Sequence, residues 1–286
     1  MQTRQQQLAD RFHALHHSGK LLILPNIWDP LGALLLESLD YPAVATASAA
    51  VAFAQGLADG EHLPFEDLRM ILRKITDRVS IPVTADIETG YARYEAQLRQ
   101  NIARLLDAGI VGINLEDTDL STGALLPIEE QCHKIRLVAE EARTRGIHLF
   151  INARTDVLVS TDSPAGEQQL AEILKRGRAY KAAGADCFYP VTLSEEAVIK
   201  TVVEELAMPV NILTVPGIPP LERLQELGVA RVSLGPAFLK YAIKHLRELA
   251  VKLQSQEGLA EILENEVSSQ YLKDLVNKPP AANLLP

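Results

Sequence analysis

Basic clusters and long apolar runs are both missing from this chain of 286 residues. Its 28 Lys and Arg residues are outnumbered by 37 Asp and Glu residues, which gives a formal net charge of −9 and a pI near 5.3. Because no local run of basic residues offsets this charge, nucleic acid and anionic membrane surfaces would repel the chain. The expected partners are therefore small molecules or other subunits, and neither nucleic acid nor a membrane.

No apolar stretch approaches the roughly 20 residues that a helix needs to cross a bilayer. The first 17 residues, MQTRQQQLADRFHALHH, also lack the apolar core of a signal peptide. Both absences predict a cytoplasmic protein.

Cysteine is scarce, with only Cys132 and Cys187, which lie far apart in the sequence. Two such residues give no disulfide framework and suit a reducing compartment, so we expect both thiols to serve packing. Histidine chemistry is only weakly indicated, because His13, His16 and His17 fall on a terminal helix and are predicted to be surface residues.

Eight short apolar or β-branched runs alternate with longer amphipathic segments. They are LLILPNI (21–27), AVATAS (43–48), PVTADI (82–87), GINLED (112–117), HLFINAR (148–154), CFYPV (187–191), PVNILT (209–214) and RVSLGP (231–236). Runs this apolar are typical of parallel strands buried on both faces, and a glycine often closes the helix before each strand. The alternation predicts an α/β fold, a single (β/α)8 TIM barrel over residues 1–286. An open doubly wound sheet is less favoured, because no glycine-rich fingerprint follows the first strand.

Two segments extend beyond the predicted barrel. Residues 1–19 contain a helix before the first strand, and residues 237–286 contain more helix than the last βα unit needs, followed by the tail NKPPAANLLP. The surplus helix carries Leu, Ile and Val residues that need a surface to pack against, and a neighbouring subunit is one candidate.

Polar residues gather at the predicted C-terminal ends of the strands, which is where such a barrel builds its active site. They are Asn26, Thr46-Ala47-Ser48, Asp86 and Glu88, Glu116 and Asp117, Arg154 and Asp156, and Asn211. The loop AVAFAQGLADGEH adds Asp59 and His62, the one histidine near the predicted rim.

Four of these acids are expected to surround a cation. Carboxylates left unpaired would repel one another, so they either raise each other's pKa or hold a positive ion. Ligands that are all oxygen favour Mg²⁺, or Mn²⁺, over zinc. Because Mg²⁺ usually keeps several waters, we expect Asp86 to bind it directly, while Glu88, Glu116 and Asp59 hold its waters.

Two other interpretations of the strand ends are a structural role for some of the acids and a different type of enzyme. Acids at strand ends often cap the following helix, and Asp117 and Asp156 are candidates for that role. A Schiff-base aldolase also occurs on this fold, but it needs a lysine at a strand end, and Lys181 and Lys200 fall in or beside helices.

Several short motifs resemble the isocitrate lyase and phosphoenolpyruvate mutase superfamily. GLADGE, TADIETGY, GINLEDT, INARTD and PVNIL resemble motifs of that superfamily on the corresponding strands and loops, and the similarity covers roughly residues 20–240. The resemblance implies a (β/α)8 barrel and an Mg²⁺-dependent site for 2-oxo acids or their enolates. It also implies a homotetramer built as a dimer of dimers, or a homodimer, with a C-terminal helix swapped between subunits.

Position by position, the resemblance gives each rim residue a role. Asp86 matches the direct metal ligand, and Asp59, Glu88 and Glu116 match the acids around the metal and its waters. Thr46, Ala47 and Ser48 match a segment that binds the substrate carboxylate, Arg154 matches a substrate-binding arginine, and Asn211 matches an asparagine near the substrate. Arg154, Glu116 and Asp59 are the expected catalytic residues.

The departures from the family pattern narrow the chemistry. Isocitrate and methylisocitrate lyases carry a Lys-Lys/Arg-Cys-Gly-His gate, and the mutase and hydrolase branch uses a gating Lys and Asn. Here residues 118–126 supply none of these, Asn114 stands in place of a histidine, and YPVTL replaces a strand-end glutamate. Cys132 lies in the following helix and does not match the gate.

The favoured function is an Mg²⁺-dependent lyase that cleaves a C–C bond of a small 2-oxo or 2-hydroxy dicarboxylic acid through an enolate. Oxaloacetate decarboxylases and dimethylmalate-type lyases are the nearest pattern, since decarboxylation needs no dedicated acid when the bond breaks. Two alternatives stay open: C–P chemistry like that of phosphoenolpyruvate mutase or phosphonopyruvate hydrolase, and a non-catalytic 2-oxo-acid binder. The segment 118–126 is either a lid or an ordinary loop.

Overall fold

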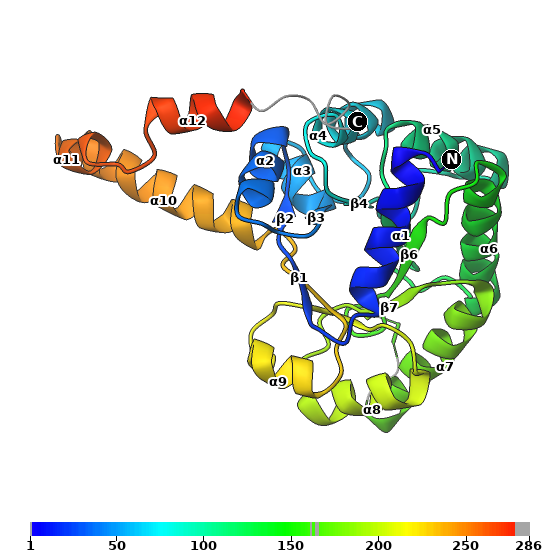
Figure 1. The fold of residues 1–286 in the computed structure, drawn as a ribbon. Helices are drawn as coiled ribbons and strands as arrows, with labels where there is room; N and C mark the ends of the chain where they lie inside the picture. Colours follow the sequence, from blue (N-terminus) through cyan, green and yellow to red (C-terminus); the bar gives the residue numbers. More distant parts are fainter. Residues whose placement is uncertain (1, 161, 164–165, 278–286) are drawn as a thin grey trace.

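Parallel strands close into a ring at the centre of the molecule (Figure 1). The computed structural model describes residues 2–160, 162–163 and 166–277. The strands are β1 (Leu22–Leu24), β2 (Asn26–Ile27), β3 (Val44–Thr46), β4 (Val83–Asp86), β5 (Gly112–Glu116), β6 (Phe150–Thr155), β7 (Cys187–Pro190), β8 (Asn211–Leu213) and β9 (Arg231–Ser233). β2 to β7 pair in order, β8 pairs with β9, and β9 pairs with β1. A parallel bridge between Phe188 and Val210 joins β7 to the residues before β8. The predicted barrel is therefore confirmed as an α/β fold of TIM-barrel type.

The first barrel strand is split into β1 and β2 at Pro25. Proline has no N–H to donate, so the ladder is interrupted at this residue. Before it, Leu22 pairs with Arg231 of β9, and after it, Asn26 pairs with Ala45 of β3. The two short strands therefore form one strand of the barrel together, and they close the ring between β9 and β3.

Helices cover the outside of the ring. They are α2 (Pro30–Ser38), α3 (Ser48–Ala54), α4 (Phe65–Thr76), α5 (Glu95–Asp107), α6 (Ile128–Thr144), α7 (Glu167–Ala183), α8 (Glu196–Leu206) and α9 (Leu221–Glu226). α4 shows the local logic: Leu68, Leu72 and Ile75 recur at helical spacing and are buried against the strands. Acids in its first turn and basic residues in its last turn complement the helix dipole.

An N-terminal helix, α1 (Arg4–His16), lies across the N-terminal ends of the strands. Its Phe12 is fully buried and meets Phe150 edge to face at 5.1 Å, while His16 stacks on Phe150 at 4.0 Å. The prediction that His13, His16 and His17 are surface residues is therefore wrong for His16, which is buried, and for His13, which is half-buried. The helix closes this end of the barrel, so the side chains on its inner face lie in largely apolar surroundings.

Because His16 is buried, we expect the free energy of unfolding to depend on pH. Desolvation, helped by the positive charge of Arg231, lowers the pKa of His16 from 6.5 to about 3. Between these values the unfolded chain binds a proton that the folded chain does not. Stability from this group is therefore complete above pH 6.5 and falls as the pH drops, by roughly 1.4 kcal/mol per unit.

Urea unfolding of wild type and His16→Phe at pH 7 and pH 5 measures this contribution. We expect His16→Phe to lose less free energy of unfolding on acidification, because the variant lacks the group that takes up a proton only in the unfolded chain. His17→Leu, on the exposed side of the same helix end, should behave like wild type. An unchanged pH slope in His16→Phe would contradict the assignment.

The C-terminal helices form an arm that leaves the barrel. α10 (Ala237–Gln254) projects away, α11 (Leu259–Leu263) lies at its far end, and α12 (Ser269–Val276) runs back toward α2 (Figure 1). Leu275 of α12 is buried, but most apolar side chains of the arm are exposed. They include Tyr241, Ile243, Leu246, Val251, Leu259, Leu263 and Tyr271. The predicted tail beyond residue 277 lies outside the described residues.

Both cysteines are free and buried, in agreement with the packing role expected for them. Among the described residues, no helix combines the length and the apolar character that a bilayer span requires.

Candidate active site

Asp86 ends β4 at the barrel mouth and is 9% exposed. Its Oδ2 accepts hydrogen bonds from Ser48 Oγ at 3.1 Å and from the Ser48 backbone N–H at 3.3 Å. Its own N–H donates to Thr46 Oγ1 at 3.2 Å. The pairing of β3 with β4 brings these segments together, so the predicted residues 46–48 and Asp86 do meet at one point of the rim.

Glu88 is buried close to Asp86 and is tied to the loop that carries Asp59. Glu88 Oε2 accepts from the N–H of Glu61 at 2.7 Å, and Glu88 Oε1 accepts from Tyr91 Oη at 3.0 Å. Glu61 in turn accepts from the N–H groups of Thr89 and Tyr91. These reciprocal bonds lock the loop 59–62 against the loop 87–91.

Three residues of this lock adopt left-handed backbone conformations. Glu61, Glu88 and Tyr91 have φ values of 59°, 51° and 55°. Such conformations are costly for residues other than glycine and persist where surrounding contacts determine them, often at functional sites. The hydrogen bonds between the two loops thus keep these residues in uncommon backbone conformations and fix the Glu88 carboxylate beside Asp86.

Burial, together with repulsion between neighbouring acids, raises the pKa values of three of these carboxyl groups. Burial, followed by repulsion from Asp86 and Asp59, raises the pKa of Glu88 to about 7. Burial also raises the pKa of Glu116 well above its ordinary range, with Arg154 opposing and Asp156 and Asp86 adding to the rise. Partial desolvation and then Asp86 raise the pKa of Asp59, although this residue is exposed on its loop. Each acid therefore ionises less readily than a free carboxyl group, and a bound cation would favour the ionised forms.

The spacing of the acids limits how they can hold an ion. Among the described residues, no three of Asp59, Asp86, Glu88 and Glu116 bring one oxygen each within 4.8 Å of one another. That spacing does not suit three carboxylates bound directly to one ion. It fits one direct ligand with the other acids reaching the ion's waters, which is the usual manner of Mg²⁺.

Arg154 is the cation that pairs directly with the acids at this rim, and Lys134 of α6 also interacts electrostatically with Glu61 and Glu116. Arg154 Nη1 lies 2.8 Å from Glu116 Oε2, and its Nε and Nη2 bind Asp156 as a fork at 2.6 and 2.9 Å. The side chain is 22% exposed, and its pKa is raised by Glu116 and Asp156 in spite of the desolvation that acts against the charge. Thr118 also donates to Asp156, which fixes the fork.

Asp117 and Asp156 do not cap the helices that follow them, which corrects that expectation. Asp117 is fully buried and accepts from Thr155, Arg176 and Tyr180. α6 begins after Pro127 with no side-chain cap. Asp117 instead ties β6 and α7 together below the rim, while Asp156 holds Arg154.

Asn211 lies deeper than the other predicted site residues. It begins β8, is fully buried, and accepts from Ser233 Oγ at 3.1 Å, while its Nδ2 is buried without a partner. Ser233 also accepts from Arg231 Nε at 3.0 Å. The asparagine therefore belongs to the polar interior under the site.

Tyr189 of β7 is a residue that the sequence analysis missed. Strand pairing places Glu116, Arg154 and Tyr189 in register on β5, β6 and β7. Burial raises the pKa of Tyr189, with Arg154 opposing and Asp86 adding to the shift, so the phenol stays neutral. The run CFYPV predicts only an apolar strand, although a tyrosine at a strand end is a signal for a rim hydroxyl.

Residues 118–126 form a compact hairpin at the rim. Thr118 and Leu125 form an antiparallel bridge, and the N–H of Gly123 donates to the carbonyl of Asp119 at 2.7 Å. The hairpin offers hydroxyl and backbone groups beside Asp156. Whether it closes over a substrate stays a prediction.

Comparison with known proteins identifies the family. The sequence profile named phosphoenolpyruvate phosphomutase matches residues 12–254, which is most of the chain. The chain belongs to the phosphoenolpyruvate mutase and isocitrate lyase superfamily. This confirms the resemblance inferred from the motifs.

Relatives within the superfamily differ in their described activities. An uncharacterized protein of Mycobacterium tuberculosis, Rv1998c, is 31% identical over 78% of this chain and 81% of its own length. An oxaloacetate decarboxylase of Ectopseudomonas mendocina is 31% identical over 83% of this chain and 81% of its own. The curated relatives thus include a C–C bond-cleaving enzyme at the same level of identity as an uncharacterized one.

Solved structures of the superfamily share the fold. A candidate phosphonomutase of Burkholderia cenocepacia J2315 is 37% identical, with a TM-score of 0.81 over 85% of this chain and 99% of that chain. A phosphonopyruvate hydrolase solved with oxalate and Mg²⁺ is 23% identical, with a TM-score of 0.81 over 93% and 94% of the two chains. Superfamily members therefore bind Mg²⁺ and small oxo-acid ligands on this fold.

Proposed function

We propose that this superfamily member is an Mg²⁺-dependent carbon-carbon lyase for a small 2-oxo or 2-hydroxy dicarboxylic acid, similar to oxaloacetate decarboxylases or dimethylmalate lyases. One observation carries the proposal: Asp86, Glu88, Glu116 and Asp59 gather at the barrel mouth, where burial and mutual repulsion raise the pKa values of Glu88, Glu116 and Asp59, which marks a concentration of negative charge even with Arg154 and Lys134 nearby. A cation and an anionic substrate that chelates it would balance it.

The residues present fit a magnesium ion. Asp86 would bind it directly, and Glu88, Glu116 and Asp59 would hold its waters, while Mn²⁺ suits the same oxygen ligands. When bound, the ion supplies Lewis-acid stabilisation of the negative charge on an enolate.

The remaining roles fall to side chains that bind and orient the substrate. Arg154 keeps one unused N–H on each terminal nitrogen after its bonds to Glu116 and Asp156, which suits a substrate carboxylate. Thr46, Ala47 and Ser48 would offer backbone and hydroxyl groups to a second anionic oxygen, and Asn211 would support the site from below. Glu116 and Asp156 hold the guanidinium in one orientation.

Decarboxylation suits a rim hairpin without a gating acid. Breaking the bond to a carboxylate releases CO₂ and leaves the electrons in the enolate, so no proton donor is required until the enolate is protonated. The hairpin 118–126 contains no Lys, Cys or His, unlike the gates of isocitrate lyases. This favours decarboxylase-like chemistry over tricarboxylate cleavage.

Incubation with Mg²⁺ and oxaloacetate tests the proposal directly. Pyruvate release that depends on the metal supports the lyase, and 2,3-dimethylmalate should be tried in parallel. Turnover of phosphonopyruvate alone would favour the C–P alternative. Binding of 2-oxo acids by calorimetry without turnover of any of these substrates would favour the non-catalytic binder.

Tyr189 is expected to donate the proton that quenches the enolate. Its neutral phenol lies in register with Arg154, and replacement by phenylalanine removes only the hydroxyl. We expect Tyr189→Phe to lower kcat about 100-fold with little change in KM, measured by coupled pyruvate detection. Tyr94→Phe, on the exposed start of α5, is the control. Full activity in Tyr189→Phe would assign the proton to another group.

The arm of α10 to α12 is proposed to pack against a neighbouring subunit, in a homodimer or a homotetramer with swapped helices. Large apolar side chains such as Leu246 (63% exposed) and Leu263 (75% exposed) rarely stay uncovered in soluble proteins. Light scattering during size exclusion should show an oligomer for wild type and smaller species for Leu246→Asp. Met70→Asp, an exposed apolar position on α4, serves as the matched control. A monomeric wild type would contradict the swap.

A further inference from the structure

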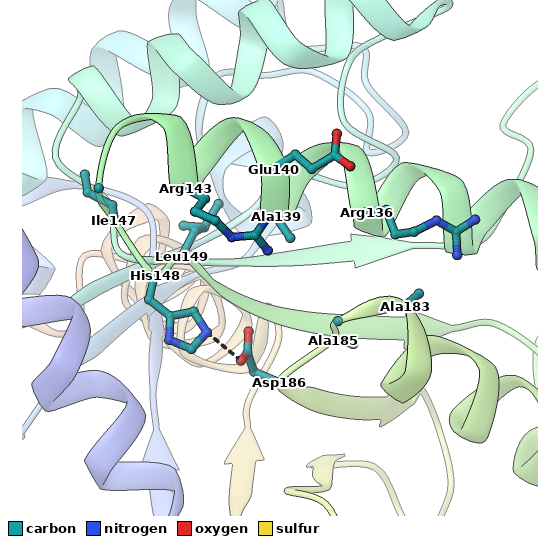
Figure 2. A pocket seen from close by; sticks show the side chains of 12 residues that line it. Arg136, Ala139, Glu140, Arg143, Ile147, His148, Leu149, Ala183, Ala185 and Asp186 are labelled. Carbon is teal, nitrogen blue, oxygen red and sulfur yellow. Dashed lines mark hydrogen bonds and ion pairs between the residues drawn. The ribbon is translucent and has the colours of Figure 1, made fainter.

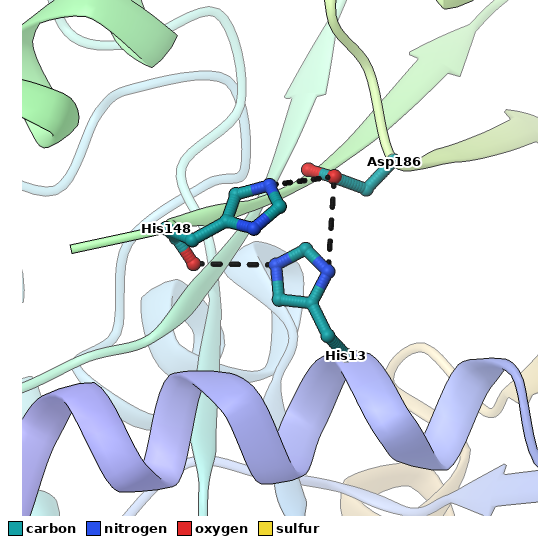
Figure 3. Close-up of side chains that lie close together, drawn as sticks. All are labelled: His13, His148 and Asp186. Carbon is teal, nitrogen blue, oxygen red and sulfur yellow. Dashed lines mark hydrogen bonds and ion pairs between the residues drawn. The ribbon is translucent and has the colours of Figure 1, made fainter.

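A second cluster of metal-ligating side chains lies at the opposite end of the barrel from the candidate active site. His148 precedes β6 and Asp186 precedes β7, whereas Asp86 and Glu116 end their strands. His13 reaches this pair from α1 (Figure 3). Three ligand groups from three distant segments of the chain therefore meet where the N-terminal helix covers the strand ends.

The three potential ligand atoms lie close together. Asp186 Oδ1 is 3.1 Å from His148 Nε2 and 3.8 Å from His13 Nδ1, and all three atoms lie within 4.8 Å of one another. Two ligands at 2.0 to 2.1 Å from a tetrahedral zinc ion are separated by roughly 3.4 Å. The observed separations bracket this value. The two imidazole rings are stacked, with centroids 3.7 Å apart and planes at 28°, so one ring has to turn before both lone pairs point at one ion. His148, with 66% of its side chain exposed, has room to turn.

Hydrogen bonds on the far side of two groups orient them as ligands. His13 Nε2 lies 3.2 Å from the carbonyl oxygen of His148, so this nitrogen carries the proton and Nδ1 keeps its lone pair toward Asp186. Asp186 Oδ2 accepts from the N–H of Ile151 at 2.8 Å, which leaves Oδ1 for the two histidines. Supporting bonds of this kind are typical of histidine and carboxylate metal ligands.

We propose that His13, His148 and Asp186 form a second metal site that takes a transition-metal ion, best Zn²⁺. Two imidazole nitrogens and one carboxylate suit zinc, whereas Mg²⁺ prefers oxygen ligands. This separates the ion from the one expected at the barrel mouth. Within the described ranges, no other group of three His, Cys, Asp or Glu residues brings its ligand atoms this close.

The fourth ligand would be a water or a small anion from an adjoining cavity. A cavity of about 800 Å³ lies beside His148 and Asp186, and Arg136, Glu140 and Arg143 of α6 also line it (Figure 2). His148 and Asp186 thus border solvent-filled space, which gives the ion an entry path. The site joins α1 to the starts of β6 and β7, so bound zinc would fasten the N-terminal helix to the barrel.

Zinc titration of the intact protein tests the site. Isothermal titration with Zn²⁺, in excess Mg²⁺ to occupy the barrel mouth, should show one ion per chain in wild type and in Asp86→Ala. In His13→Ala, His148→Ala and Asp186→Asn the affinity should fall more than about tenfold. His148 is exposed, so its variant should fold normally. Zn²⁺ should raise the Tm of wild type and leave that of His148→Ala unchanged.

His133→Ala is the matched control, because His133 pairs with Glu95 on the surface without a second histidine. It should bind zinc like wild type, and Co²⁺ in place of zinc should give the visible absorption of tetrahedral coordination. The proposal is overturned if wild type binds no zinc, or if His148→Ala and wild type bind it equally. Neither result bears on the lyase proposal, because the readout is metal stoichiometry and not turnover.

Discussion

Asp86→Ala should reduce Mg²⁺-dependent turnover of the substrate by about 1000-fold or more. The variant removes the one carboxylate expected to contact the ion directly, and with it the Lewis-acid stabilisation of the enolate. It also leaves Ser48 Oγ and N–H without their acceptor, whereas Thr46 Oγ1 keeps its hydrogen bond from the backbone N–H of residue 86. Pyruvate release from oxaloacetate over a range of Mg²⁺ concentrations measures the effect.

Two controls separate the loss of the ion from a loss of structure. Asp67→Ala changes an acid in the first turn of α4, outside the site, and should keep full activity. Thermal unfolding of Asp86→Ala should remain cooperative, because removing one acid from a crowded group relieves repulsion from Glu88 and Glu116. Activity close to wild type in a folded Asp86→Ala would remove Asp86 from the metal site.

Arg154→Met should lower kcat/KM by about 100- to 1000-fold and also destabilise the fold. The substrate carboxylate loses a charge-assisted fork, and Glu116 and Asp156 lose their buried cation. Breaking a buried ion pair in this manner costs roughly 3 to 5 kcal/mol. Steady-state kinetics and urea unfolding measure the two effects separately.

Two further variants separate the effect of the positive charge of Arg154 from the effect of its planar side-chain geometry. Arg154→Lys keeps the charge but cannot bind Asp156 and a carboxylate as a planar fork, so most of the activity should still be lost. Arg154→Met combined with Asp156→Asn removes one stranded carboxylate, so it should regain stability without regaining activity. Wild-type kinetics in Arg154→Lys would show that charge alone suffices.

The barrel was predictable because its signals are local. Each strand is a short apolar run, and each helix shows three- and four-residue spacing, so the pattern survives without knowledge of the neighbours. The end of each strand follows from the run itself, which is why the sequence alone predicts Asp86, Glu116 and Arg154 at one rim.

The missed features depend on contacts between distant segments. Glu61 accepts hydrogen bonds from residues 28 and 30 positions away, and nothing in GLADGEH marks that role. The sequence near His16 predicts a surface residue, because it gives no sign that Phe150, which is distant in the sequence, covers the imidazole. Asn211 lies deeper than its place in PVNILT suggests, because depth in a barrel follows from strand stagger.

The substrate is the part of the function that the motifs leave least determined. Its core is expected to be held by backbone groups, Arg154 and a metal ion, all of which recognise carboxylates and oxo groups without regard to substituents. Substituents would meet the hairpin 118–126, which contains no Lys, Cys or His. A metabolite screen against the purified protein would therefore inform on the substrate more than further motif comparison.

The pairing of β1 with β9 has a consequence for how the chain is made. Leu22 meets Arg231 and Leu24 meets Ser233, so the ring cannot close until nearly the whole chain has left the ribosome. Contacts of such long sequence separation slow folding and leave apolar edges uncovered in the meantime. Phe12 likewise cannot pack against Phe150 until that residue has been synthesised. We therefore expect the newly made chain to depend on chaperones more than its finished, closed barrel would suggest.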